Sequence, residues 1–168
     1  MKGIALIISG PTGVGKDTVA NIIIEKYGAK KLTSFTTRPK REDDKEGDYV
    51  FLTKKEYFTL LREGKFIDSE PVIIHGHYYG LSIQNLKDSL NKLNITILNL
   101  AKNTLLLVKE IFPANTVLIY LMPPSIKILK SRLKKRGMKK EKIFERLKKE
   151  GQYFKFSLIS EYDLIITN

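Results

Sequence analysis

A short glycine-rich segment near the start of the chain has the residue types and spacing of a phosphate-binding loop. Its sequence, GPTGVGK, spans residues 10–16 and matches the G-x-x-x-x-G-K pattern. It follows a continuous apolar run at residues 4–8 and precedes apolar residues at helical spacing, residues 19–27. Glycines let the backbone turn tightly, so that successive N–H groups point at phosphate oxygens beside a helix N-terminus. We therefore expect the loop to cradle a triphosphate, with Lys16 bridging its outer phosphates.

The residue after Lys16 departs from the usual pattern. Ser or Thr is typical there because its hydroxyl binds Mg²⁺, whereas this chain has Asp17 followed by Thr18. A carboxylate beside a triphosphate is repelled unless a cation lies between them. Two alternatives are open: Asp17 holds Mg²⁺ through water, or it turns away and pairs with a lysine. Thr18, the next residue, offers a hydroxyl. We therefore expect either Asp17 or Thr18 to bind the metal.

A second group of phosphate-binding candidates lies further along the chain. Arg38 and Arg41 follow Ser34, and Tyr49 and Tyr79 come later. Arginine offers a rigid fork of donors that matches phosphate oxygens, and hydroxyl groups can complete the shell. These residue types suit a phosphate monoester, but an ordinary surface loop with arginines explains the spacing equally well.

The elements that must position these residues alternate between buried strands and helices. Apolar, β-branched runs predict strands at residues 4–8, 95–100, 117–121 and 164–166. Apolar residues at helical spacing, with Gly28 as a stop signal and Ser125 as a cap, predict helices at residues 19–27, 54–62, 105–111 and 126–136. This alternation favours an α/β P-loop fold with three layers, in which helices cover both faces of a central parallel sheet.

Residues from about 33 to 84 interrupt this alternation. They are polar and rich in Thr, Asp, Tyr and Gly, with one short helix among them. We expect a small insertion of short strands that covers a binding cleft.

Composition excludes several other classes of protein. The 168 residues contain no cysteine, so disulfides and thiolate metal sites are excluded, and no apolar stretch is long enough to span a bilayer. The N-terminal apolar run leads into the glycine-rich loop, which favours a strand over a signal peptide, and we expect a cytoplasmic protein. The net charge is +12, and twelve Lys and Arg residues fall within residues 127–149. Without a nucleic-acid motif or interleaved aromatic residues, this run favours a solvated helix surface, so no nucleic-acid partner and no membrane partner are expected.

Together with the phosphate loop, three later segments resemble the guanylate kinase family over nearly the whole chain. They are S-F-T-T-R at residues 34–38, G-D-Y-V-F at 47–51 and Y-Y-G at 78–80. The resemblance implies ATP and Mg²⁺ as the phosphoryl donor, small-molecule nucleotides as partners, and a monomer or homodimer. It also implies a P-loop core (residues 1–32, 85–124 and 148–168), a nucleotide-binding insertion (33–84) and a helical lid (125–147). The residues matching those that hold the GMP phosphate in the family are Ser34, Arg38, Arg41, Tyr49 and Tyr79.

The lid matches the family through an R-L-x-x-R-G pattern at residues 132–137 and an arginine further on. The resemblance implies that Arg132, Arg136 and Arg146 close over the ATP phosphates and stabilise charge on the transferring group. A solvated basic helix is the alternative. The implied catalytic residues are Lys16, Arg136 and Arg146. The implied ATP-binding residues are Gly10, Pro11, Thr12, Gly13, Val14, Gly15, Lys16, Asp17, Thr18, Arg132 and Arg136.

The positions that read the guanine base in the family are altered here. Asp68 replaces the family's glutamate, and Glu70 is an alternative because an apparent insertion follows. The hydroxyl position is Leu81, with Ser82 one residue later. The family's L-D-I-D strand reads L-N-L-A at residues 98–101, and the sequence shows no counterpart of the family's C-terminal helix. Phosphate contacts are therefore kept while base contacts are weakened, which lowers the expected discrimination between bases.

These observations predict ATP-dependent phosphoryl transfer to a nucleoside monophosphate, with GMP as the leading acceptor. Another nucleoside monophosphate and ribose 1,5-bisphosphate stay open, because the ribose 1,5-bisphosphate phosphokinase family shares G-K-D, an apolar residue after Y-Y-G, and asparagine on the metal strand. That family lacks the equivalents of Arg41 and Asp48–Tyr49. A non-catalytic phosphopeptide-binding module is a further alternative, which the intact Lys16 and its glycines disfavour.

Overall fold

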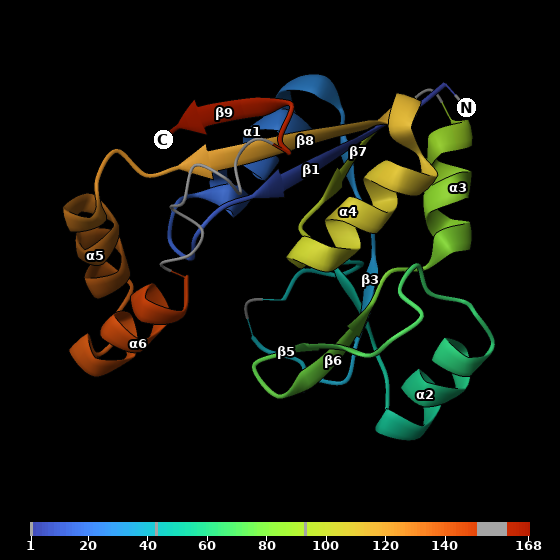
Figure 1. Cartoon of the computed structure of the whole chain (residues 1–168), viewed down its shortest axis with the longest axis horizontal. Helices are drawn as coiled ribbons and strands as arrows, with labels where there is room; N and C mark the ends of the chain where they lie inside the picture. Colours follow the sequence, from blue (N-terminus) through green and yellow to red (C-terminus); the bar gives the residue numbers. More distant parts are fainter. Residues whose placement is uncertain (1, 43, 93, 151–160) are drawn as a thin grey trace.

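The main body of the protein is a five-stranded parallel sheet (Figure 1). The computed structural model describes residues 2–42, 44–92, 94–150 and 161–168, with only the backbone described for 149 and 150. The sheet has the strand order β2-β7-β1-β8-β9, so the first long strand lies at its centre. Its strands are β1 (Ile4–Ser9), β2 (Lys30–Lys31), β7 (Ile95–Leu98), β8 (Thr116–Met122) and β9 (Leu164–Thr167). The predicted central parallel sheet is therefore confirmed.

Each face of this sheet packs against its own set of helices. Successive side chains of a strand point to opposite faces, so Ile7 and Ile8 of β1 enter different cores although both are buried. The core around Ile7 is closed by α3 (Ile83–Asn91) and α4 (Lys102–Ile111). The core around Ile8 is closed by α1 (Lys16–Tyr27) and by two helices near the C-terminus. These two cores give the three layers expected from continuous apolar strands.

A second, four-stranded sheet lies below the first in Figure 1 and falls within residues 34–80. Its order is β4-β3-β6-β5, and its strands are β3 (Ser34–Thr36), β4 (Tyr49–Phe51), β5 (Val72–Ile74) and β6 (His77–Gly80). The expected insertion of short strands is thus present as a separate sheet, while its exact limits stay a prediction.

An aromatic cluster joins helix α2 (Lys54–Arg62) to the second sheet. The ring of Tyr57 stacks on Phe66 and on Tyr78, with 5.2 Å between ring centroids in both pairs. The Tyr57 hydroxyl donates to the Tyr79 carbonyl at 3.0 Å and accepts from the Val72 N–H at 3.4 Å. The cluster therefore fixes the strand that carries Tyr79.

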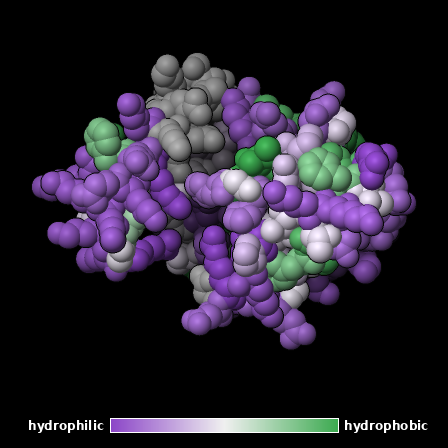
Figure 2. Space-filling model, turned by 90° about the horizontal axis from the view of Figure 1, so that it is seen from below, coloured by the Kyte–Doolittle hydropathy of each residue, from purple (hydrophilic) through white to green (hydrophobic). Residues whose placement is uncertain are grey.

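Two basic helices, α5 (Ile126–Lys135) and α6 (Lys140–Glu150), lie at the opposite end of the molecule from α2 (Figure 1). Ser125 caps α5 by accepting from the Ile128 N–H at 3.2 Å, as its sequence position predicts. Figure 2 shows mostly hydrophilic side chains over this end. No helix in the described part of the chain is both long and apolar enough to cross a membrane.

The observed elements differ from the predicted ones mainly at their ends. The helix at residues 54–62 and the stop at Gly28 are confirmed. The strand predicted at residues 95–100 is shorter than expected and spans Ile95–Leu98. Helix α3 has no counterpart among the predicted helices, whereas α6 begins within the helical lid expected at residues 125–147. The many lysines of α6 obscure the helical spacing of Ile143 and Leu147 in the sequence, although both side chains pack against the core around Ile8.

We expect the Tyr57→Phe substitution to lower the free energy of unfolding by about 1–2 kcal/mol, because it removes two part-buried hydrogen bonds, to the Tyr79 carbonyl and from the Val72 N–H. Urea unfolding followed by circular dichroism measures the change. Tyr27→Phe is the matched control, since Tyr27 is 60% exposed. Equal stability of both variants and the wild type would show that the Tyr57 hydroxyl does not hold the cluster.

Candidate active site

The glycine-rich segment forms a tight loop between β1 and α1. Gly15 caps α1 with a φ of 107°, a conformation that L-residues rarely adopt, and no side chain caps the N-terminus of this helix. The Lys16 ammonium folds back over the loop and donates to the carbonyls of Gly10 at 2.8 Å and Pro11 at 3.2 Å. A cationic group thus lies beside a helix N-terminus, the arrangement that binds phosphate oxygens.

A cavity of about 500 Å³ brings the phosphate loop and the arginine segment together. Lys16 and Asp17 line it from the start of α1, and Arg38, Arg41 and Tyr49 line it from the segment that carries the second sheet. These residues lie far apart in the sequence, so only the fold places them around one space. Lys16 of the predicted donor site and three predicted acceptor-site residues therefore face the same cavity.

Arg38 is held in place before any ligand binds. Its side chain is almost fully buried, and both Nη atoms donate to the carboxylate of Asp44, with Nη1 to Oδ2 at 2.7 Å. The guanidinium also lies over the Tyr49 ring, 4.7 Å from its centroid. The hydrogen bonds with Asp44 raise the pKa of Arg38 above its ordinary value. The same bonds, with one from the Arg41 N–H, hold the pKa of Asp44 well below its ordinary value.

Asp44 is a site residue that no pattern in the sequence predicts. Its only sequence signal is an acidic residue in the loop that follows the two arginines. Asp44 occupies the Nη edge of Arg38, an edge that also suits a phosphate, so it acts as the counter-charge of a buried cation.

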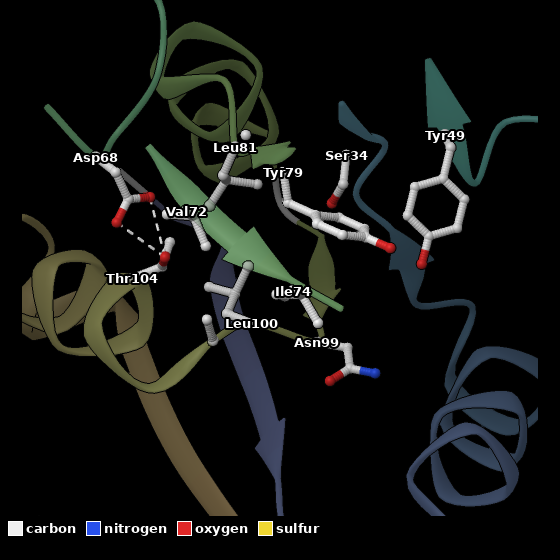
Figure 3. A pocket seen from close by; sticks show the side chains of 12 residues that line it. Ser34, Tyr49, Asp68, Val72, Ile74, Tyr79, Leu81, Asn99, Leu100 and Thr104 are labelled. Carbon is white, nitrogen blue, oxygen red and sulfur yellow. Dashed lines mark hydrogen bonds between the residues drawn. The ribbon is translucent and has the colours of Figure 1, made fainter. Parts of the chain in front are cut away.

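A second cavity, of about 260 Å³, adjoins the first, because Tyr49 and Asn99 line both. Ser34, Tyr49 and Tyr79 stand together at one side of it, with the hydroxyl groups of both tyrosines directed into the space between them (Figure 3). The ring centroids of the two tyrosines are 6.5 Å apart. The predicted hydroxyl ligands thus lie where the two cavities meet.

The other side of this smaller cavity holds one carboxylate among apolar side chains (Figure 3). Asp68 is only 8% exposed and accepts from Thr104 Oγ1 of α4, at 2.9 Å and 3.0 Å to its two oxygens. Burial raises the pKa of the Asp68 carboxyl, and the hydrogen bond from Thr104 acts in the opposite direction. The apolar residues around it are Val72, Ile74, Leu81, Leu100 and Ala101. No pattern in the sequence predicts Thr104, whose hydroxyl is the polar group beside the Asp68 carboxylate on this side of the cavity.

Several predicted site residues lie outside these two cavities. Glu70 is exposed and lines neither of them, so the structure places Asp68 rather than Glu70 in the wall. Ser82 is buried and caps α3 by accepting from the Asn85 N–H at 3.2 Å. Its hydroxyl therefore has a structural role in the cap.

The three lid arginines do not line the cavities either. Arg132 Nη1 donates to the main-chain carbonyls of Val14 and Asn168, behind the phosphate loop. Arg136 ends α5 and is exposed, and Arg146 lies half-buried on α6. Their predicted contacts with ATP phosphates stay predictions.

The residues present fit Mg²⁺ only as an ion shared with phosphate. Among the described residues, no three His, Asp or Glu side chains converge as a metal site. Asp17 lines the larger cavity beside Lys16, whereas Thr18 does not. Since Mg²⁺ is usually held by one or two carboxylates together with substrate phosphates, Asp17 suits this role better than Thr18.

Comparisons with known proteins agree on one family. The family model described as guanylate kinase matches residues 2–168. A guanylate kinase of Caldanaerobacter subterraneus subsp. tengcongensis is 34% identical over 170 residues, which cover 99% of this chain and 80% of the relative. One of Thermotoga maritima is 33% identical over 171 residues, covering 100% of this chain and 80% of the relative. The crystal structure of guanylate kinase from Anaplasma phagocytophilum superposes with a TM-score of 0.72 at 32% identity, covering 99% of this chain and 77% of that one.

We expect the Asp68→Asn variant to be more stable than the wild type at pH 7. Because burial raises the folded-state pKa of Asp68, its ionised form costs stability above that pKa, and the cost disappears as the pH falls toward the ordinary value of 3.8. The stability difference between the two proteins, measured by urea unfolding, should therefore shrink from pH 7 to pH 4. Glu70→Gln, at an exposed position, is the control. A pH-independent difference would contradict this origin of the effect.

Proposed function

The chain belongs to the guanylate kinase family, and we propose that it transfers the γ-phosphoryl group of ATP to GMP, forming ADP and GDP. One observation carries this proposal: Lys16 of the phosphate loop and the two arginines of the insertion line a single cavity. Two phosphate sites that face each other suit direct transfer between two phosphates.

On the acceptor side, the proposed ligands of the GMP phosphate are Ser34, Arg38, Arg41, Tyr49 and Tyr79. Both Nη atoms of Arg38 donate to Asp44, so a phosphate that binds this edge of the guanidinium would take the place of the carboxylate. Arg41 is exposed, and its main-chain N–H is bonded to Asp44. Its side chain can therefore close onto the phosphate.

On the donor side, the triphosphate binds the backbone N–H groups of residues 12–18, and the Lys16 ammonium moves from the loop carbonyls to the phosphate oxygens. An oxygen of the acceptor phosphate attacks the γ-phosphorus in line, while the bond to the bridging β–γ oxygen breaks and its electrons pass to ADP. The attacking oxygen is anionic at neutral pH, so no strong general base is needed. Mg²⁺ bound to the triphosphate neutralises negative charge there, and Asp17 is its proposed protein ligand.

Lid closure supplies the remaining positive charge in this proposal. Arg136 and Arg146 lie on the two basic helices, at positions from which they line neither cavity. A motion of the chain that carries Arg136 and Arg146, with Arg132 staying at the phosphate loop, would bring them onto the transferring group and exclude water. The limits of this lid, a cytoplasmic location and a monomeric or homodimeric state are predictions from the sequence.

The buried carboxylate favours a nucleobase over a second phosphate at the inner end of the acceptor cavity. Asp68 can accept from adjacent N–H donors of guanine, and the apolar walls suit a flat ring. The second phosphate of ribose 1,5-bisphosphate would meet the Asp68 carboxylate there and be repelled. The intact phosphate loop, in turn, favours an enzyme over a phosphopeptide-binding module.

We expect GMP to be the preferred acceptor in an ADP-release assay with ATP and Mg²⁺. The panel contains GMP, dGMP, AMP, UMP, CMP and ribose 1,5-bisphosphate. Since Leu81 and Ala101 offer no side-chain hydrogen bonds to the base, we expect kcat/KM for GMP to exceed that for AMP by roughly 100-fold, less than a fully paired site achieves. Faster turnover of ribose 1,5-bisphosphate than of GMP would overturn the proposed acceptor.

Substitution of the two phosphate sites should separate their roles. We expect Lys16→Ala to lower kcat by roughly 100-fold or more, because charge on the transferring group is left uncompensated.

Arg41→Ala should instead raise KM for GMP about tenfold with little change in KM for ATP. Lys40→Ala is the control for Arg41, since Lys40 is exposed and lines neither cavity. Turnover of the Lys16 variant at the wild-type rate would rule out this mechanism.

A further inference from the structure

The main-chain carbonyl of Val14, at the back of the phosphate loop, accepts from two side chains at once. Asn168 Nδ2 donates to it at 2.7 Å and Arg132 Nη1 at 3.1 Å. The same Nη1 also donates to the Asn168 carbonyl at 2.9 Å, so the three residues form a closed triangle. Val14 itself is fully buried. One guanidinium nitrogen and one side-chain amide therefore hold one peptide of the loop from outside.

This triangle joins three parts of the fold that are remote in sequence. Arg132 lies on α5, and Asn168 follows β9, where its N–H donates to the Met122 carbonyl at the end of β8. In Figure 1 the end of β9, marked C, and α5 lie at the same end of the main sheet. Asn168 approaches the loop so closely that a Cβ at Gly15 would lie 2.5 Å from its Nδ2. The loop is thus packed against the lid helix and the sheet edge.

The position of the carbonyl determines where the next N–H points. In a planar trans peptide the C=O of one residue and the N–H of the next lie on opposite sides of the chain. Donors that hold the Val14 carbonyl outward therefore turn the Gly15 N–H inward, toward the hollow of the loop. The guanidinium also places a positive charge behind this peptide.

We propose that Arg132 and Asn168 are positioning residues that aim the Gly15 N–H at the phosphates of ATP. Arg132 acts through the loop backbone and makes no direct contact with the phosphates, in contrast to the role that the sequence suggested for it. The inference rests on the proposed use of ATP at this loop. It is independent of the acceptor, because the acceptor cavities do not include these residues.

Nucleotide binding measured by calorimetry tests the proposal without turnover, using ADP and ATP with Mg²⁺. We expect Arg132→Met and Asn168→Leu each to weaken ADP binding about tenfold, the value of one charge-assisted or buried hydrogen bond. KM for ATP should rise in parallel, while KM for GMP stays within about twofold of the wild type, since the loop alone is disturbed. The Arg132→Lys variant keeps the charge and can reach one carbonyl, so it should recover part of the lost affinity.

Two matched controls separate positioning from charge and from folding. Lys130→Met removes one positive charge from an exposed position of α5, and Thr167→Val alters an exposed neighbour of Asn168. Both should bind ADP like the wild type. In a double-mutant cycle, Arg132→Met and Asn168→Leu should be non-additive, because both act on the Val14 carbonyl.

Three results would overturn the proposal. If Asn168→Leu binds ADP normally while Arg132→Met does not, Arg132 contacts the phosphates directly. If Lys130→Met weakens binding as much as Arg132→Met, the effect is one of diffuse charge. If KM for ATP and KM for GMP rise together with a lower thermal midpoint, the triangle only supports folding. A wild type that binds ADP but does not phosphorylate GMP would contradict the proposed acceptor and leave this test intact.

Discussion

Phosphoryl transfer between two nucleotides requires two anionic phosphate groups to approach within bonding distance, against their mutual repulsion. The protein meets this constraint with positive groups on both sides of one cavity, Lys16 from the start of α1 beside the main sheet and Arg38 and Arg41 from the segment that carries the second sheet. The two sheets can therefore be understood as two supports, one for each phosphate. Within the second support, the aromatic cluster on α2 holds the strand that carries Tyr79.

The buried guanidinium of Arg38 creates a second constraint, because an isolated buried charge is strongly unfavourable. Asp44 compensates the buried charge by forming an ion pair with Arg38, and the rings of Tyr49 and Phe51 lie against the same guanidinium. The pair fixes the orientation of the guanidinium through two charge-assisted hydrogen bonds. A similar logic applies behind the phosphate loop, where Arg132 and Asn168 satisfy the buried Val14 carbonyl and, as we propose, orient the neighbouring N–H.

The sequence did not reveal three residues of the candidate site. Two of them bond to residues far away in the sequence, and the third is one of several acidic residues that look alike in the sequence. Thr104 meets Asp68 across 36 residues, and Asn168 meets Val14 across 154. Asp44 is only six residues from Arg38, yet it lies in an acidic stretch of the sequence where nothing marks which carboxylate turns inward. Side-chain pairing of this kind follows from packing, and a single sequence carries no local signal for it.

The sequence by itself determined the phosphate loop, the alternation of parallel strands and helices, and the helix at residues 54–62, because glycine spacing, apolar runs and capping residues act over a few neighbouring positions. The tertiary structure alone decided that Asp68 rather than Glu70 enters the cavity wall. It also decided that Arg132 turns toward the back of the loop, while Arg38 is already paired. These outcomes depend on which distant segments pack together, and on the rule that buried polar groups find partners wherever the fold brings them within reach.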